Sequence, residues 1–219
     1  MPPPTRPPPS YPRPRRALSG QGGEVETRGA DELAAPLAEA LAAGGSEVEQ
    51  ENATHGFHSY PARMHPAIAG ALIERFSAPG DALLDPFCGS GTVLIEALRS
   101  GRRATGVDLN PLAIRVAEVQ TALRGAEDRE RFAVELARLG EASLERVRER
   151  VPVRAALSAH ERTFYGPHVL LELAGLRAEI DGVEREDDRR AFEIVFSSLL
   201  VKFSLQRGDT SDELIEKRI

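Results

Sequence analysis

The stretch Asp85-Pro86-Phe87-Cys88-Gly89-Ser90-Gly91-Thr92 decides the fold of this chain. It follows the short apolar run 82–84, which predicts a buried strand, and it precedes residues 93–98, whose apolar positions have helical spacing. A turn of this kind lies at the carboxyl end of the strand, where open α/β sheets bind their ligands. The stretch therefore predicts an α/β fold with a site at the turn.

A second strand is predicted at residues 104–107, ending at Asp108. Asn110 suits the N-cap of the next helix, and Pro111 suits its first position, where a missing amide proton costs nothing. The order strand, turn, helix, strand, helix favours a right-handed parallel βαβ unit. We therefore expect a parallel sheet flanked by helices.

Further helices are expected outside this unit. Periodicity and end signals place them at residues 31–43, 66–76, 127–150, 169–180 and 191–203. The segment 127–150 is densely charged with few apolar residues, which predicts an amphipathic cover or helical insert. The charged cluster 184–190 is expected to separate the last two helices. The apolar run 197–203 also fits a strand.

Length and composition predict one globular domain with appendages. The chain has 219 residues, of which 41% are hydrophobic and 28% are charged. Residues 1–30 are rich in proline, glycine and arginine, so we expect a disordered tail, with a basic arm that contacts nucleic-acid phosphates as the alternative. Residues 31–125 are predicted to form the α/β core, and residues 126–219 a mainly helical segment.

Cysteine usage and charge exclude several classes of protein. Cys88 is the single cysteine, which excludes an intramolecular disulfide and a thiolate zinc site. No apolar run approaches the roughly 20 residues that span a bilayer, and the N-terminal residues do not resemble a signal peptide. We therefore expect a cytoplasmic protein without membrane contact. The formal net charge of -6 argues against polyanion binding by the whole surface.

The turn and the second strand together indicate a nucleoside site. Gly89 and Gly91 let the backbone approach a ligand closely, and the amides at the helix start are available to a polar group. Asp108, 17 residues after Gly91, is placed to accept hydrogen bonds from a ribose diol. These features predict a nucleoside-cofactor pocket, and a tight structural turn without ligand is the alternative.

Two other nucleotide sites fit the turn less well. A dinucleotide fingerprint requires a small residue three positions after the second glycine, where this chain has Leu94. A phosphate-binding P-loop ends in Gly-Lys-Ser/Thr, whereas Gly91 is followed directly by Thr92. Nicotinamide dinucleotide is therefore disfavoured, and a P-loop more so.

At these residues the sequence resembles the amino-methylating DNA methyltransferases, the N6-adenine/N4-cytosine family. Their cofactor motif reads Asp-Pro-Phe-Cys/Met-Gly-Ser-Gly-Thr, and residues 85–92 match it throughout. The resemblance extends backward through residues 58–66 and forward through residues 101–113. It covers residues 55–121 closely and residues 164–209 more loosely.

The resemblance implies S-adenosylmethionine as cofactor and a Rossmann-like methyltransferase fold, here incomplete. Asp85, Gly89 and Gly91 would line the methionine end of the cofactor, and Asp108 would hold the ribose hydroxyls. Tyr60 and Ala62 would close the pocket from the upstream segment. The full set of implied cofactor-binding residues is Tyr60, Ala62, Asp85, Phe87, Gly89, Gly91, Thr92, Asp108 and Asn110.

Methyl transfer to an exocyclic amine needs a further element. In the family an Asp/Asn/Ser-Pro-Pro-Tyr/Phe loop accepts hydrogen bonds from the amine and stacks on the flipped base. Pro-Pro pairs occur here only within residues 2–4 and 7–9, and neither context supplies that loop. No catalytic residue is assigned. We expect either a fragment whose catalytic loop lies beyond Ile219 or an inactive cofactor-binding remnant, and we favour the fragment.

Three functions follow from the sequence. The first is the cofactor-binding part of a DNA methyltransferase acting on adenine or cytosine in a restriction-modification or orphan setting, with DNA as partner. The second is a guanine-N2 RNA methyltransferase, which uses a similar loop but usually carries an upstream RNA-binding domain. The third is a noncatalytic binding module.

Several residues outside the motif have alternative interpretations. His55, His58 and His65 cluster locally, but no cysteine or carboxylate pair completes a zinc set, so no metal is expected. Cys88 is expected to be a small buried residue. The aromatic residues Phe57 and Tyr60 fit contact with an adenine ring or core packing equally. The arginines Arg63, Arg102 and Arg103 fit phosphate contacts or, more commonly, solvated surface charges.

Overall fold

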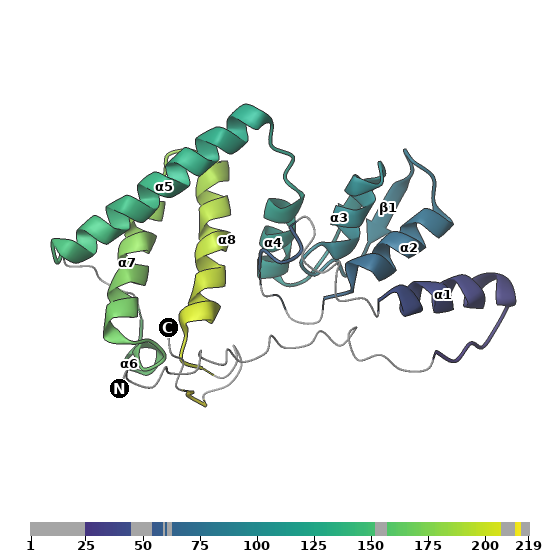
Figure 1. The fold of residues 1–219 in the computed structure, drawn as a ribbon, viewed down its shortest axis with the longest axis horizontal. Coiled ribbons are helices and arrows are strands. Elements are labelled where there is room, and N and C mark those ends of the chain that lie inside the picture. The colour runs from purple at the N-terminus through teal and green to yellow at the C-terminus, as the bar shows by residue number, and fades with distance from the viewer. Residues whose placement is uncertain are drawn as a thin grey trace, which may run out of the picture.

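The computed structural model describes residues 25–44, 54–58, 60, 63–151, 157–206 and 213–215. Its elements, shown in Figure 1, are α1 (Asp31–Ala43), α2 (Pro66–Phe76), β1 (Ala82–Asp85), α3 (Thr92–Arg99), β2 (Arg103–Gly106), α4 (Pro111–Thr121), α5 (Ala126–Arg148), α6 (Ala159–Arg162), α7 (Pro167–Asp181) and α8 (Glu186–Phe203). Of the tail predicted at residues 1–30, residues 1–24 lie outside the described part.

The two strands form a parallel pair with α3 as the connection between them. Ala82 lies opposite Arg103 and Asp85 lies opposite Gly106. The predicted parallel strand–helix–strand unit is therefore confirmed, and the described residues have an α/β arrangement. The second strand was predicted at residues 104–107 and lies one residue earlier, because the pairing of β1 with β2 ends opposite Asp85.

Short polar side chains set where α2 and α4 begin. The side-chain oxygen of Asn110 accepts a hydrogen bond from the amide of Leu112 at 3.0 Å, and Pro111 follows as the first helical residue. The predicted cap of α4 is therefore confirmed. His65 has the same role at α2, where its Nδ1 accepts a hydrogen bond from the amide of Ala67 at 3.2 Å.

The core of the α/β part lies between the sheet and the helices α3 and α4. Cys88, Leu94 and Ala117 form its buried cluster, with Ala104 and Ile114 packed against them. On the other face of the sheet Leu84 is 66% exposed, although parallel sheets are ordinarily covered on both faces. Figure 1 shows α2 beside α3, and α1 beside α2.

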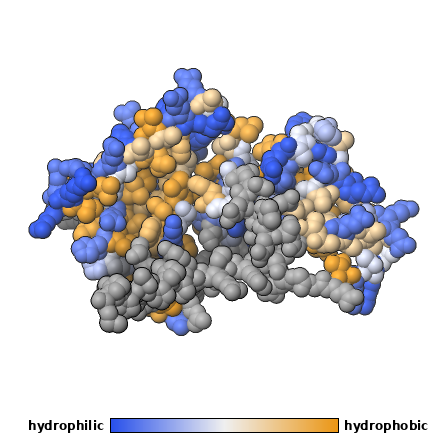
Figure 2. All heavy atoms as spheres, in the orientation of Figure 1, coloured by the Kyte–Doolittle hydropathy of each residue, from blue (hydrophilic) through white to orange (hydrophobic). Residues whose placement is uncertain are grey.

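The second part of the molecule is helical. The long helix α5 crosses α7 and α8, and Figure 2 shows apolar side chains gathered where these helices meet. Leu139, Ile180, Val183 and Phe192 form the buried cluster, and the ring of Phe132 stacks on Phe192 with 4.3 Å between centroids. Contacts between α4 and α8 join this part to the α/β part.

Two sequence interpretations are wrong in this helical part. Residues 197–203 belong to α8 and form no strand. The cluster 184–190 does not separate α7 from α8, because α8 already begins at Glu186. Three acids stand in the first turn of α8, where the helix dipole favours negative charge, and one of them, Asp188, is buried against arginines.

The remaining predicted helices are confirmed with small shifts at their ends. The predicted helices at 31–43 and 66–76 coincide with α1 and α2, while those at 127–150 and 169–180 are seen as α5 and α7. Helix α6 was not predicted; it begins with a capping box between Ser158 and Glu161. In the part of the chain that the structure describes, none of the helices combines the length and apolar character needed to cross a membrane.

Candidate functional site

The candidate site is built on the turn that leaves β1. The amide of Phe87 donates to the carboxylate of Asp85 at 3.1 Å, and the amide of Cys88 donates to the carbonyl of Val107 at 2.9 Å. These two bonds hold the turn against the end of β1 and against the chain that leaves β2. The turn therefore has a fixed position at the carboxyl ends of both strands.

Both glycines of the turn have left-handed backbone conformations. Gly89 has φ +50° and Gly91 has φ +90°, and Gly91 is the N-cap residue of α3. A Cβ added to Gly91 would lie 3.1 Å from the Cβ of Ala117, which is tighter than ordinary contact. Gly91 is therefore required both by its backbone conformation and by the close approach of α4.

Asp108 lies where β2 ends and is held by backbone amides on both of its carboxylate oxygens. One oxygen accepts from the amide of Gly89 at 2.9 Å and the other accepts from the amide of Asn110 at 2.8 Å. The hydrogen bonds from Asn110 and Gly89 lower the pKa of Asp108 below its ordinary value. A carboxylate offers about four lone-pair positions, more than these backbone amides occupy, so room remains for donors from a ligand.

Tyr60, from the segment upstream of α2, contacts the glycine turn and the residues that follow β2. Its hydroxyl accepts a hydrogen bond from the side-chain amide of Asn110 at 3.2 Å. Its ring lies beside the turn, because a Cβ added to Gly89 would be 3.6 Å from the Cε1 atom of Tyr60. The structure thus brings together residues of the predicted set from three separate stretches of the sequence: Tyr60, Gly89, and Asp108 with Asn110.

The other predicted residues have different positions around this group. Asp85 ends β1 and orients the turn, and Thr92 is buried as the first residue of α3. The side chain of Phe87 projects from the turn and is 83% exposed. Ala62 lies outside the described residues.

Cys88 is a packing residue of the turn, as predicted. It is 6% exposed and belongs to the buried cluster beneath the sheet. Burial raises the pKa of its thiol, and the negative charges of Asp85 and Asp108 raise it further. The thiolate form, which nucleophilic chemistry requires, is therefore disfavoured.

A cavity of about 480 Å³ opens next to Asp108, between α4 and α8. Its wall has apolar side chains of Leu109, Pro111 and Ile114 from the α4 side, and α8 contributes Arg190, Glu193 and Ile194. This contribution of α8 was not predicted. The periodicity of residues 191–203 indicates a helix with an apolar face, but no spacing in the sequence indicates which helix that face contacts.

The local histidines have structural partners. His55 lies 2.7 Å from the carboxylate of Glu96, His58 lies 3.2 Å from the hydroxyl of Ser197, and His65 caps α2. Burial lowers the pKa of His58, and the positive charge of Arg63 lowers it further. Within the described ranges no three histidine, cysteine or acidic residues are grouped as metal ligands.

The arginines near the turn are not equivalent. Arg102 is 8% exposed and donates to the hydroxyl and carbonyl of Ser77 and to the carbonyl of Ser100. Its interpretation as a phosphate contact or solvated charge is therefore wrong, because its guanidinium holds two loops together. Arg63 donates to the carbonyl of His55, and Arg103 is exposed in β2.

Comparison with known proteins identifies the segment that contains this site. Residues 43–119 match the family model described as DNA methylase. The chain is 35% identical over 75 residues to the type II methyltransferase M.MjaII of Methanocaldococcus jannaschii, and 41% identical over 71 residues to the type II methyltransferase M.MvaI of Kocuria varians. Residues 43–119 are an amino-methylating DNA methyltransferase region.

The methyltransferase region accounts for a limited share of each protein compared. The similarity to M.MjaII spans 34% of this chain and 14% of that protein, and the similarity to M.MvaI spans 31% and 16%. A tRNA (guanine(10)-N2)-dimethyltransferase of Methanothermobacter thermautotrophicus is 42% identical over 52 residues, which are 23% of this chain and 16% of that protein. No solved structure shows a significant match.

Proposed function

We propose that the methyltransferase region binds S-adenosylmethionine between the glycine turn and Asp108. The supporting observation is the Asp108 carboxylate, which two backbone amides hold in place beside the turn while lone pairs remain for other donors. Two ribose hydroxyls are donors of the kind that this carboxylate can accept. The acceptor oxygens of Asp108 therefore match the ribose hydroxyls of the cofactor.

The residues around Asp108 have separable roles in this proposal. Gly89 and Gly91 would line the methionine end of the cofactor, with Asp85 orienting the turn and Thr92 starting the helix. Asn110 holds Tyr60, whose ring beside Gly89 closes the site. The exposed ring of Phe87 stands at the mouth of the site. In the cavity beside Asp108, Leu109 and Ile114 form an apolar part of the wall for the adenine ring, and charged residues of α4 and α8 form much of the rest.

We propose DNA as the substrate, with methylation of the exocyclic amine of adenine or cytosine. S-adenosylmethionine supplies a methyl group on a positively charged sulfur when bound. The exocyclic amine is a weak nucleophile, and a Pro-Pro-aromatic loop of the family type is absent from residues 10–219. We therefore propose that residues 1–219 bind the cofactor in a Rossmann-like fold but do not transfer the methyl group by themselves.

The division of the chain follows from the same proposal. Residues 31–125 would form the cofactor-binding core, and residues 126–219 a helical segment that leads toward the catalytic region. A restriction-modification setting is supported by the type II methyltransferases among the similar proteins.

Isothermal titration with S-adenosylmethionine tests the cofactor site. We expect saturable binding by the full chain, and a loss of about tenfold or more for Asp108→Ala, because hydrogen bonds to a charged group are lost. Asp181→Ala removes an exposed carboxylate at the end of α7 and should bind as the unchanged chain does. Absence of binding at millimolar cofactor, or equal affinity for Asp108→Ala in a folded protein, would refute the proposal.

RNA is the second candidate substrate, because a tRNA methyltransferase is 42% identical over 52 residues. Transfer of radiolabelled methyl groups to duplex DNA and to transfer RNA separates the two substrates. We expect no transfer by residues 1–219 alone, and transfer to DNA when a Pro-Pro-aromatic catalytic region is supplied. Transfer to RNA in place of DNA would favour the second candidate.

A further inference from the structure

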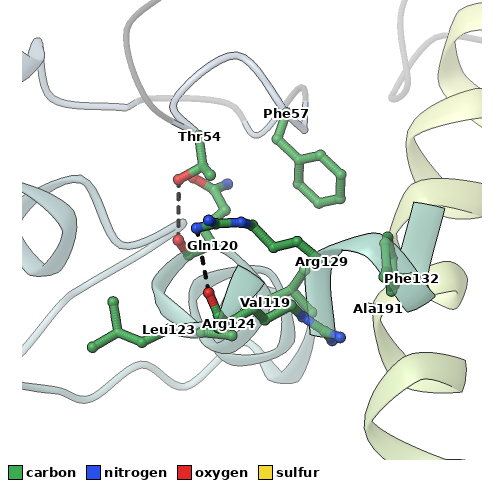
Figure 3. A pocket seen from close by; sticks show the side chains of 11 residues that line it. Thr54, Phe57, Val119, Gln120, Leu123, Arg124, Arg129, Phe132 and Ala191 are labelled. Atoms are coloured by element: carbon green, nitrogen blue, oxygen red, sulfur yellow. Dashed lines mark hydrogen bonds between the residues drawn. The ribbon is translucent and has the colours of Figure 1, made fainter. Parts of the chain in front are cut away.

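A second cavity lies at the opposite end of α4 from Asn110. Its volume is about 480 Å³, and it is enclosed by the end of α4, the connection 122–125, the start of α5, α8 and the segment 54–58. Figure 3 shows the side chains of Phe57, Gln120 and Arg129 gathered around the opening. Since α4 has 11 residues, its ends are about 16 Å apart, so Gln120 lies far from Asp108, although Val119 lines both this cavity and the one beside Asp108.

Gln120 presents an unused hydrogen-bond donor to this cavity. The residue is 7% exposed, and its Nε2 atom has no hydrogen-bond partner among the described residues. Its backbone carbonyl is occupied, because it accepts from the hydroxyl of Thr54 at 3.0 Å. A buried amide without a partner costs about 1–3 kcal/mol, so an acceptor supplied by a ligand would be favourable here.

Positive charge is in excess at the same cavity. Arg129 makes one long hydrogen bond, at 3.4 Å to the carbonyl of Arg124, and it forms no ion pair with the carboxylates that the structure describes. Arg124 contacts the buried carboxylate of Asp188, which Arg131 and Arg185 also contact, and Arg131 pairs with Asp128 as well, so Arg124 has no carboxylate of its own. The start of α5 adds backbone amides, because its N-cap Gly125 has no side chain to occupy them.

The remaining walls are apolar and partly aromatic. Phe57 faces the cavity from the segment 54–58, and Phe132 lies beneath the guanidinium of Arg124, whose carbon is 4.6 Å from the ring centroid. Leu123 is 89% exposed at the rim. A flat ring can pack on such a wall, and aromatic side chains stack on nucleobases by about 1–3 kcal/mol per base.

We propose that this cavity binds a nucleotide. The base packs against Phe57 and accepts a hydrogen bond from Nε2 of Gln120, and the phosphate binds Arg129 near the start of α5. The nucleotide is either a free mononucleotide or one unit of a DNA strand, and both present the same base and phosphate. The proposal goes beyond the proposed cofactor site, and the residues assigned to the nucleotide, Phe57, Gln120 and Arg129, are not assigned to the cofactor.

Equilibrium binding by the full chain tests this proposal with two probes. One is deoxycytidine monophosphate, whose pyrimidine does not resemble the adenosine of S-adenosylmethionine, and the other is a fluorescein-labelled single-stranded DNA of twelve nucleotides. The variants are Gln120→Leu, which removes the donor and keeps apolar bulk, and Arg129→Gln, which removes the charge. Arg148→Gln on the same helix is the matched control, because Arg148 lies 19 residues from Arg129 and is 73% exposed.

We expect at least one probe to bind, with about tenfold weaker binding for Gln120→Leu and for Arg129→Gln and no change for Arg148→Gln. Binding of both probes identifies a mononucleotide site, and binding of the strand alone identifies a DNA contact. No binding at millimolar probe overturns the proposal, as does equal weakening by Arg129→Gln and Arg148→Gln, which would indicate unspecific attraction to charge.

Thermal unfolding shows whether each variant is folded. Gln120→Leu should melt at the same temperature as the unchanged chain or higher, because it removes a buried donor that has no partner. Unchanged probe affinity in folded Gln120→Leu overturns the assignment of the donor to the ligand. Titration with S-adenosylmethionine on the same samples separates this site from the proposed function, since either ligand can bind while the other fails.

Discussion

The carboxylate of Asp108 accepts a hydrogen bond from the amide of Gly89 at 2.9 Å. This bond joins the end of β2 to the glycine turn that follows β1, so the two halves of the proposed cofactor site are held by one contact. The acid that we assign to the ribose therefore also fixes the turn that we assign to the methionine end. A change at Asp108 is expected to affect both stability and cofactor binding.

Asp108→Asn is expected to lower the free energy of unfolding at pH 7. An asparagine side chain has one oxygen, so one of the two amides of Gly89 and Asn110 loses its acceptor and faces a second donor. Urea unfolding of both proteins measures the difference. Asp181→Asn, at an exposed site, should have a much smaller effect.

The difference in unfolding free energy between the unchanged chain and Asp108→Asn is expected to depend on pH. The pKa of Asp108 is lowered in the folded state, so its stabilising contribution is present above the unfolded pKa of about 3.9 and is lost as the pH falls through the lower folded pKa. The difference between the two proteins should stay constant from pH 8 to about pH 5 and decrease only below about pH 4. A difference that vanished between pH 7 and pH 5 would mean that the pKa is raised.

Gly91→Ala should destabilise the fold more than Gly80→Ala. Both glycines have nearly the same backbone conformation, with φ +90° and +92°, but an added Cβ meets Ala117 at 3.1 Å only at Gly91 and meets nothing within 4 Å at Gly80. The left-handed conformation costs an alanine about 1–2 kcal/mol in both proteins, and overpacking adds about 1–3 kcal/mol at Gly91. Equal losses in chemical denaturation would show that α4 does not press on the turn.

Stability is expected to fall as the pH drops below about 6.5 because of His58. Burial and then the charge of Arg63 lower the pKa of this histidine, so the unfolded chain binds a proton that the folded chain resists. The loss begins near the unfolded pKa and is complete below the folded one. Urea unfolding at pH 7.5, 6.5 and 5.5 should show a smaller pH dependence in His58→Gln, and an unchanged dependence would assign the effect to other groups.

Asp188→Ala is expected to lower the free energy of unfolding by about 3 kcal/mol, because it leaves arginines around a buried site without their carboxylate. Asp188 is 3% exposed and contacts Arg124, Arg131 and Arg185. Burial opposes ionisation of Asp188, but hydrogen bonds and charges of Arg124 and Arg131 lower its pKa overall. Glu186→Gln breaks an exposed pair with Arg190 and should cost less than about 1 kcal/mol. Similar losses in the two variants would contradict the structural role of Asp188.

Local signals in the sequence predicted the elements around the turn because each signal acts within a few residues. The cap by Asn110, the position of Pro111 and the buried Cys88 depend on their immediate neighbours. Periodicity likewise placed α1, α2, α5 and α7 closely. The start of α8 was missed because the charged residues at its first turn resemble a loop until Asp188 is paired with Arg124.

Such local signals could not predict contacts between segments that are distant in the sequence. The family motif led to Tyr60, but nothing in the spacing indicates that its hydroxyl meets Asn110. Burial of Arg102 depends on Ser77, which lies 25 residues away, and the cavity beside Gln120 depends on the segment 54–58 and on α8. These features arise from how the elements pack, which one sequence does not specify locally.

The central claim is that the glycine turn and Asp108 hold the same molecule of S-adenosylmethionine. Nitrogen-15 NMR of the full chain tests it directly, because Gly89 and Asn110 donate their amides to the two oxygens of Asp108. Both amide signals are expected to shift on addition of S-adenosylmethionine with one common dissociation constant, while those of Gly80 and Gly140 stay unchanged. Signals of Gly89 and Asn110 that stay fixed at saturating cofactor, or that follow different constants, would contradict it.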